Sequence, residues 1–310
     1  MKKPIIIIVI LFVAVGIYFW AKGPSNVVVA PVTTDTINTT QTSPTQNNTV
    51  VNNGVPKDPT QTVLGKSVEG RDITAFHYGT GAGEIIFTLG IHGGYAWNTV
   101  ILGYQIMDYF KKNPSAIPAN VKVTVIPVLN PDGLNKTIGK TGVFTSADVP
   151  TSQEALVAGR FNGHNVDLNR NFDCDWQSTG TWQNKAVSGG TSAFSEPESQ
   201  AVKNYVQLNS PVAVIAWYSA AGGVYASSCH NGVSIPTNTI MKEFAKASKY
   251  PANADFDFYE ITGDMVNWLA KNNIPAISVL LTNHTDTEWA KNLAGITAVL
   301  NYFGTGKISQ

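Results

Sequence analysis

Short apolar runs alternate with longer amphipathic segments from residue 61 onward. Nearly continuous apolar runs are typical of strands that are buried on both faces. Such runs lie at about 85–91, 121–128, 212–217 and 276–281. Segments with apolar positions at helical spacing lie at about 97–112, 196–208, 237–248, 263–272 and 288–302. Strands that alternate with helices predict an α/β fold, in which helices cover both faces of one sheet.

The first residues follow a different pattern. Lys2 and Lys3 precede an uncharged apolar run from Pro4 to Trp20, close to the minimum of about 17 residues that can cross a bilayer. This pattern predicts an N-terminal membrane anchor over residues 1–22, with the rest of the chain outside the cytoplasm, at the cell surface or in the periplasm. A cleaved signal segment, and therefore a secreted protein, is the alternative.

Residues 23–60 are rich in Thr, Asn, Val, Gln and Pro and poor in charged and aromatic side chains. A segment of this composition buries too little apolar surface to offset the entropy lost on ordering. It predicts a disordered stalk, which leaves residues 61–310 as one domain.

The charge balance excludes one class of partner. The chain has 21 basic and 21 acidic residues, whereas a protein that holds a polyanion usually carries an excess of basic residues. We therefore expect no nucleic-acid partner. Charged residues make up 14% of the chain, against about 25% in an average soluble domain, so the sequence predicts a neutral, polar surface.

The chain contains two cysteines, Cys174 and Cys229. In an oxidising compartment such a pair predicts one disulfide, and two buried free thiols are the alternative. The two residues lie far apart in sequence and form no CxxC motif, so they give little indication of a zinc finger.

Polar stretches follow the predicted strands. They are IHGGYAWNT, NPDG, GRFNGHNVDLNRNF and AWYSAAGG. In an α/β sheet, ligands bind beyond the carboxyl ends of the strands, so we expect these loops to contain the functional residues.

Six motifs together resemble the zinc metallocarboxypeptidases, the carboxypeptidase A-like peptidases. In chain order they are HGGYAWNT, LNPDG, RFNGHNVDLNRNF, FSEPES, WYSAAGG and YEITGDMVNW, and they cover nearly the whole domain. The resemblance implies a mixed central sheet of about eight strands flanked by helices. It also implies one zinc ion that activates water against a terminal peptide bond, and a substrate that is a peptide or a peptidoglycan stem peptide with a free carboxylate.

The resemblance assigns roles to five residues. His92 matches the first zinc ligand, and Arg160 matches the arginine that polarises the scissile carbonyl, a role that requires a fixed positive charge. Asn169 and Arg170 match the pair that grips the substrate's terminal carboxylate, which the planar guanidinium can bind with two hydrogen bonds. Tyr259 matches the tyrosine that closes over the substrate. A surface ion pair is the alternative for Arg160, and core packing is the alternative for Tyr259.

Two positions depart from the family pattern. Ala96 stands where the family has a glutamate ligand, and Tyr218 stands where it has a histidine ligand. A catalytic zinc ion normally has three protein ligands and a water, and His92 alone remains, so we expect poor zinc binding. Two functions stay open. One is an exported zinc carboxypeptidase that uses another ligand, and the other is a catalytically inactive protein of this fold that binds peptide C-terminal carboxylates.

The general base is also open. The family has a glutamate at the end of the last central strand, where this chain has Leu280 and Leu281. Glu288 is the candidate catalytic replacement, although an acid in the first turn of a helix is also favoured by the helix dipole. His284 and Asp286 are more typical of loop residues.

Overall fold

The computed structural model describes residues 60–306. The predicted anchor over residues 1–22 and the predicted stalk up to residue 59 lie outside this range. Within it, no helix combines the length and the hydropathy that crossing a bilayer requires.

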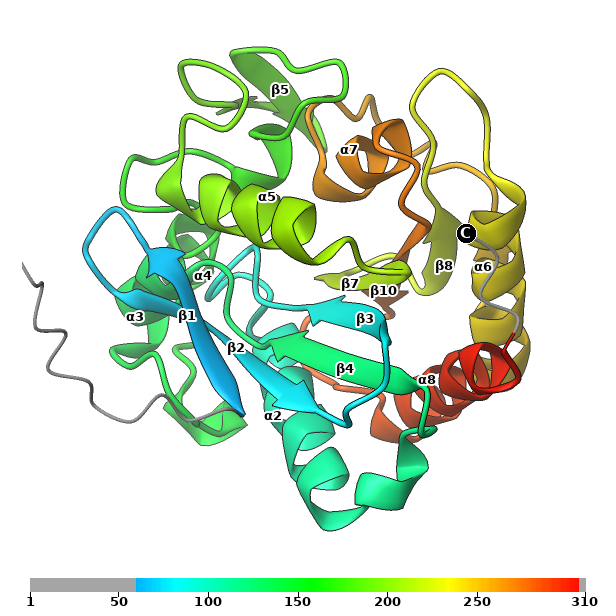
Figure 1. Cartoon of the computed structure of the whole chain (residues 1–310). Coiled ribbons are helices and arrows are strands. Elements are labelled where there is room, and N and C mark those ends of the chain that lie inside the picture. Colours follow the sequence, from blue (N-terminus) through cyan, green and yellow to red (C-terminus); the bar gives the residue numbers. More distant parts are fainter. Residues whose placement is uncertain (1–59, 307–310) are drawn as a thin grey trace, which may run out of the picture. The chain divides into compact units, whose positions relative to one another are not determined.

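A mixed sheet of eight strands forms the centre of the described domain (Figure 1). Its strand order is β1-β2-β4-β3-β7-β10-β8-β9. In chain order the strands are β1 Gln61–Lys66, β2 Asp72–Tyr78, β3 Gly83–Thr88, β4 Val121–Ile126, β7 Ala213–Ser219, β8 Gly223–Ala226, β9 Ala252–Asn253 and β10 Ala276–Leu281. The four adjacent strands β4, β3, β7 and β10 run parallel and correspond to the four apolar runs of the sequence. The predicted α/β class and mixed sheet are confirmed.

Helices cover both faces of this sheet. They are α2 Trp97–Lys112, α3 Pro131–Ile138, α4 Gln153–Ala158, α5 Pro197–Asn209, α6 Ile235–Ser248, α7 Met265–Lys271 and α8 Trp289–Gly304. Apolar residues of α2, α6 and α8 pack on one face, and those of α5 and α7 pack on the other (Figure 1). The predicted helix at 97–112 is α2 itself, and the other four predicted helices match α5, α6, α7 and α8 within two residues at each end.

The topology brings distant segments to one edge. Because β3, β7 and β10 are parallel neighbours, the loops that follow them leave from the same edge of the sheet. The register pairs Leu280 of β10 with Tyr218 of β7. The loop that contains His92 follows β3, so the family-like motifs of the sequence meet at this edge.

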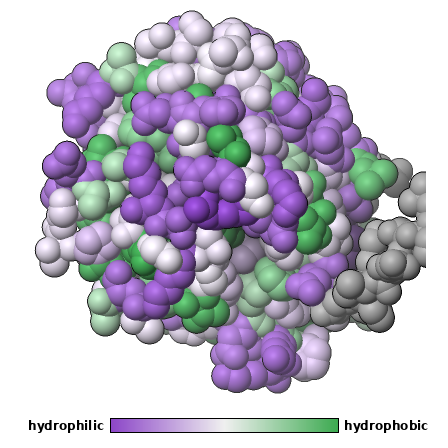
Figure 2. Space-filling view, turned by 90° about the vertical axis from the view of Figure 1, so that its left-hand side faces the viewer, coloured by the Kyte–Doolittle hydropathy of each residue, from purple (hydrophilic) through white to green (hydrophobic). Residues whose placement is uncertain are grey.

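The predicted disulfide is present between Cys174 and Cys229, and the alternative of two free thiols is wrong. A two-stranded hairpin, β5 Thr179–Trp182 and β6 Lys185–Ser188, follows Cys174 in the chain and is separate from the main sheet. The molecular face in Figure 2 is largely hydrophilic, and hydrophobic residues on it form only small separate patches.

Candidate functional site

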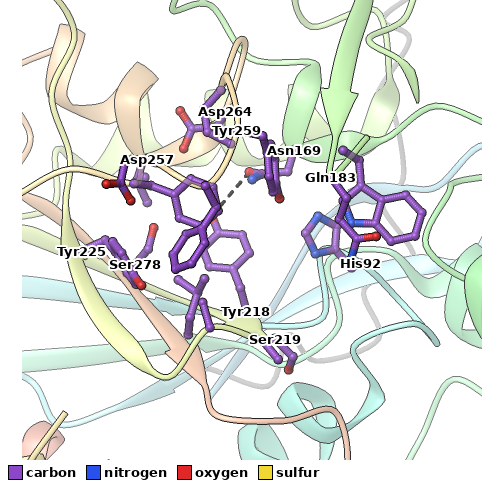
Figure 3. A pocket seen from close by; sticks show the side chains of 18 of the residues that line it. His92, Asn169, Gln183, Tyr218, Ser219, Tyr225, Asp257, Tyr259, Asp264 and Ser278 are labelled. Atoms are coloured by element: carbon purple, nitrogen blue, oxygen red, sulfur yellow. Dashed lines mark hydrogen bonds between the residues drawn. The ribbon is translucent and has the colours of Figure 1, made fainter. Parts of the chain in front are cut away.

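A cavity of about 920 Å³ opens at the carboxyl edge of the central strands (Figure 3). Most of the residues singled out from the sequence line it, namely His92, Arg160, Asn169, Arg170, Tyr218, Tyr259, Leu280 and His284. His92 and Tyr259 lie 167 residues apart, since His92 follows β3 and Tyr259 precedes α7. The fold therefore gathers these residues into one site.

His92 is held at the cavity wall by a tight turn. Gly93 has a φ of 43°, and a Cβ atom there would lie 2.6 Å from the carbonyl oxygen of Gly159. A larger residue at position 93 would therefore push the loop away. The imidazole is 5% exposed and its ring centroid lies 5.8 Å from that of Tyr218. Neither ring nitrogen has a hydrogen-bond partner, although Nε2 lies 3.5 Å from Oδ1 of Asp167.

The environment of His92 favours the neutral imidazole. Burial lowers the pKa of His92 to about 4, the charge of Arg160 acts in the same direction, and Asp167 acts against both. Burial alone would raise the pKa of Asp167, but Arg160 and His92 outweigh it and hold that pKa well below its usual range. At neutral pH the site therefore contains a neutral ring beside a charged carboxylate.

Arg160 forms a buried ion pair, not the surface pair that was the alternative. Its Nε and Nη2 atoms donate to Oδ2 of Asp167 at 2.9 and 2.7 Å. Its guanidinium carbon lies 4.4 Å from the ring centroid of Trp182 and 5.6 Å from that of Tyr95. Arg160 is 2% exposed, so Asp167 neutralises its charge and two aromatic rings cover it.

Arg170 is fixed by backbone carbonyls. Its Nε and Nη2 atoms donate to the carbonyl oxygen of Thr181 at 3.1 and 2.7 Å, and Nη1 donates to that of Asn169 at 2.6 Å. A guanidinium has five N–H groups, so one remains on each terminal nitrogen. Gly180 of β5 permits this arrangement, because a Cβ atom there would lie 2.7 Å from Cδ of Arg170.

Asn169 and Tyr259 flank this guanidinium. Oδ1 of Asn169 accepts hydrogen bonds from the hydroxyl of Tyr218 at 3.4 Å and from the backbone N–H of Met265 at 3.3 Å. The ring centroid of Tyr259 lies 5.8 Å from the guanidinium carbon of Arg170. Tyr259 therefore lies at the cavity beside Arg170, as a residue that closes over a ligand would.

The residues around His92 do not fit a zinc site with three protein ligands. A neutral buried imidazole with two unpartnered nitrogens suits a metal, but Ala96 offers no ligand atom. Burial and the charge of Asp264 raise the pKa of Tyr218 well above its usual value, so its phenol stays protonated. Leu280, which lines the cavity beside Tyr218, is apolar.

Within residues 60–306, one group of three or more potential metal-binding side chains lies close together, and it does not include His92. It consists of Cys174, Asp175, Cys229 and His230. Its two sulfur atoms form the disulfide, so this group provides no thiolates.

Glu288 is not brought to the cavity. It stands at the N-cap position of α8, and its carboxylate accepts hydrogen bonds from the Thr282 backbone at 2.7 Å, the Tyr250 hydroxyl at 2.6 Å and Lys291 at 2.6 Å. Burial alone would raise the pKa of Glu288, but these partners outweigh it and lower that pKa. The contacts are those of a structural acid at a helix start. The cavity-lining residue of β10 nearest the expected glutamate position is Leu280, whereas Leu281 packs in the core on the other face.

Two further cavity residues, Trp182 and Asp264, were not singled out from the sequence. Trp182 lies on the β5–β6 hairpin, which has no strong apolar pattern. Asp264 lies in the segment YEITGDMVNW, where an acid directly before a helix looks like an ordinary N-cap. Only the fold reveals that both side chains face the site.

The comparisons agree on one family and one fold. Residues 53–290 match the family model described as zinc carboxypeptidase. A metallocarboxypeptidase A-like protein of Trichophyton verrucosum is 25% identical over 66% of this chain and 53% of its own length. Human carboxypeptidase D is 25% identical over 62% of this chain and 12% of its own length. The matched region thus covers about half of the length of the first relative and about an eighth of the length of the second.

Among solved structures, bovine thrombin-activatable fibrinolysis inhibitor superposes with a TM-score of 0.65 at 17% identity, over 79% of this chain and 90% of that one. Carboxypeptidase A from Helicoverpa armigera superposes with a TM-score of 0.61 at 18% identity, over 81% of this chain and 69% of that one. Murein-tripeptide amidase MpaA from Escherichia coli O157 gives a TM-score of 0.54 at 18% identity, over 79% and 92%. At these identities the likeness concerns the fold.

Proposed function

This chain belongs to the zinc carboxypeptidase family, and from that premise we propose that it binds the carboxyl-terminal end of a peptide or peptidoglycan stem peptide without hydrolysing it. One observation supports the proposal above all. The residues that match the family's grip on the terminal carboxylate line one cavity, and Ala96 and Tyr218 stand where the resemblance places two metal ligands.

Binding would centre on Arg170. One N–H on each of its terminal nitrogens is not used by the carbonyl oxygens of Thr181 and Asn169, and two parallel N–H groups match the two oxygens of a carboxylate. The fixed guanidinium loses little side-chain entropy on binding. Tyr259 would swing aside to admit the peptide end and then pack over it.

The absence of hydrolysis would follow from the same cavity. Arg160 is paired with Asp167, so its charge is compensated before any substrate carbonyl arrives. Leu280 lies where a carboxylate would be needed to accept a proton from water. The tyrosine at position 218 stays protonated at neutral pH, as its raised pKa requires.

Calorimetry tests the binding half of the proposal. We expect the full chain to bind a short N-acetylated peptide with a free carboxylate and to show at least tenfold weaker binding of the same peptide as its C-terminal amide. Equal binding of the two peptides would contradict the proposal, because the amide lacks the charge that Arg170 recognises.

The zinc content of the purified chain tests the second part of the proposal, the absence of hydrolysis. After zinc loading and dialysis, we expect far less than one zinc ion per wild-type chain. The double variant Ala96→Glu/Tyr218→His is the matched control, because it restores the two ligand positions. A triple variant that also carries Leu280→Glu supplies a base. Near-stoichiometric zinc in the wild-type chain would instead favour the second candidate, an active carboxypeptidase that recruits another ligand.

We also propose that the chain is exported, with residues 1–22 as its membrane anchor. The Cys174–Cys229 disulfide supports this, because such bonds persist mainly in oxidising compartments. Protease treatment of intact cells should digest the domain if it lies outside the cytoplasm. Protection until the cells are lysed would contradict the proposed location, and release into the medium would indicate a secreted protein.

A further inference from the structure

Two short segments bring four potential metal ligands together beside the cavity. Cys174 and Asp175 precede β5, and Cys229 and His230 lie between β8 and α6. Their ligand atoms are two sulfurs, a carboxylate oxygen and an imidazole nitrogen, and all four lie within 4.8 Å of one another. The neighbouring residue Ser228 lines the cavity, so this group borders the cavity without forming part of it.

The side chains beside the disulfide are already in contact. Nε2 of His230 and Oδ1 of Asp175 are 2.9 Å apart, and Oδ2 of Asp175 lies 3.8 Å from Sγ of Cys174. The two cysteines are buried, whereas Asp175 and His230 are exposed. An ion from the solvent can therefore reach the group from the side of the carboxylate and the imidazole.

The backbone holds this grouping in both segments. In an extended segment, successive side chains point to opposite faces. Asp175 and His230 each follow a cysteine directly, and they have φ values of 53° and 64°, a left-handed conformation that is uncommon outside glycine. Residues in such sparsely populated conformations persist where the surrounding structure holds them, and they cluster at functional sites. The same conformation occurs twice here, with the carboxylate and the imidazole beside the two sulfurs.

The disulfide withholds two of the four ligands. A metal ion binds the thiolate form of cysteine, and a sulfur in a disulfide is not a thiolate. Two thiolates, an imidazole and a carboxylate have the ligand types and the number of a closed tetrahedral zinc site. Thiolates disfavour Ca²⁺ and Mg²⁺, which prefer oxygen ligands. The group therefore differs from a zinc site in the oxidation state of its sulfurs.

We propose that reduction of the Cys174–Cys229 disulfide creates a zinc site formed by Cys174, Cys229, His230 and Asp175. A dithiol supplies the two electrons, forms its own disulfide and leaves a proton on each cysteine sulfur. Binding of Zn²⁺ then forms two Zn–S bonds and releases these two protons to the solvent. Zn–S bonds of about 2.3 Å place the sulfurs about 3.8 Å apart, and Cα atoms that are 6.2 Å apart leave room for this arrangement.

The zinc ion would replace one cross-link by another. The disulfide joins the segments before β5 and after β8 in an oxidising compartment, and the metal joins the same segments when the sulfurs are reduced. A ligand that binds the folded chain raises its stability, so zinc should raise the unfolding midpoint of the reduced chain. The inference goes beyond the proposed function and does not depend on peptide binding.

The zinc content of the chain in its two redox states tests the inference. The full chain is reduced with excess dithiothreitol, which is then removed under nitrogen because dithiols bind zinc themselves. After zinc loading and dialysis, we expect about one zinc ion per reduced chain and far less than one per oxidised chain. With Co²⁺ in place of Zn²⁺, the reduced chain should show the absorption spectrum of tetrahedral, thiolate-bound cobalt.

Three variants assign the ligands. His230→Asn should lower the zinc affinity of the reduced chain at least tenfold, because it removes the nitrogen ligand. His164→Asn is the matched control, since His164 is also an exposed histidine paired with a carboxylate, that of Glu196, and its loss should leave the zinc content unchanged. Cys174→Ser/Cys229→Ser should gain no zinc on treatment with the dithiol. Circular dichroism checks the folding of each variant.

Three results would overturn the inference. The first is a disulfide that the dithiol does not reduce in the folded chain, measured as free thiols, because the site could then not form. The second is a zinc content that does not rise on reduction. The third is full zinc binding by reduced His230→Asn, which would assign the ion to other residues, such as those around His92.

Discussion

Arg170 is the proposed carboxylate-binding residue, and its side chain is also buried and hydrogen-bonded within the fold. It is 1% exposed and donates to two backbone carbonyls, so alanine would leave a cavity and buried acceptors without donors. Binding tests on Arg170→Ala would therefore mix folding with recognition. Lysine retains the charge and most of the volume but has no planar fork.

We expect Arg170→Lys to weaken binding of peptides with a free carboxylate by about 10- to 100-fold, which corresponds to the loss of a charge-assisted hydrogen bond of about 1.5–3 kcal/mol. Calorimetry on the wild-type chain and the variant measures this change, with thermal unfolding as the check of folding. Affinity within twofold of wild type would show that the carboxylate is held elsewhere.

Asp264 should make the stability of the chain depend on pH. Burial raises its pKa from 3.8 to about 6, so the folded chain holds a proton that the unfolded chain loses between these values. The stability contributed by this group is present below about pH 4 and is lost as the pH rises through about 6. Asp264→Asn does not titrate. It should unfold at the same urea concentration as wild type near pH 4 and should gain up to about 3 kcal/mol relative to wild type at pH 8.

The exposed acid Asp257 gives the control for that experiment, because Asp257→Asn should change stability by less than about 0.5 kcal/mol at either pH. A stability difference between Asp264→Asn and wild type that stays constant from pH 4 to pH 8 would contradict the assignment.

At the scale of elements, the sequence predicts the strands that are buried and does not predict the exposed edge strands. The central strands β3, β4, β7 and β10 are buried along most of their length, so their apolar runs are visible without the structure. Edge strands such as β1 are largely exposed, and β9 has two residues, so neither leaves a hydrophobic pattern. Their positions in the sheet depend on pairing with other strands and not on a pattern in their own sequence.

The site could be predicted only in part, for a similar reason. His92, Asn169 and Arg170 lie within recognisable sequence motifs, and the fold brings them together. Glu288 was a candidate because it follows β10 closely, but hydrogen bonds from Tyr250, Thr282 and Lys291 hold it at the start of α8. The register pairs Leu280 of β10 with Tyr218 of β7, and both residues line the cavity.

The β5–β6 hairpin should control the position of Arg170. We expect Gly180→Ala to weaken peptide binding by about tenfold, because the added Cβ would lie 2.7 Å from Cδ of Arg170 and force the guanidinium to move. Gly142→Ala is the matched control, since no atom lies within 4 Å of its added Cβ. Unchanged peptide affinity in Gly180→Ala would mean that the exact place of the guanidinium does not matter.

At the scale of the whole molecule, the replaced positions belong to segments far apart in sequence. Ala96 precedes α2, Tyr218 is the last residue but one of β7, and Leu280 lies in β10, yet Tyr218 and Leu280 are paired neighbours. If these positions have the roles that the family resemblance implies, the three changes together remove two of three metal ligands and the base. Asn169 and Arg170 retain the family pattern and line the same cavity, which supports the proposed binding role.

The disulfide links two segments that are distant in the sequence. Cys174 and Cys229 are 55 residues apart, and closing a loop of that length stabilises a folded chain by about 4 kcal/mol in the chain-entropy model. We expect Cys174→Ser/Cys229→Ser to lose stability of this order in urea unfolding, and reduced wild type to behave like the variant. The carbonyl oxygen of Cys174 also accepts a hydrogen bond of 2.7 Å from the backbone N–H of Gly263, next to Asp264. An unchanged unfolding midpoint would show that the folded domain does not depend on this bond.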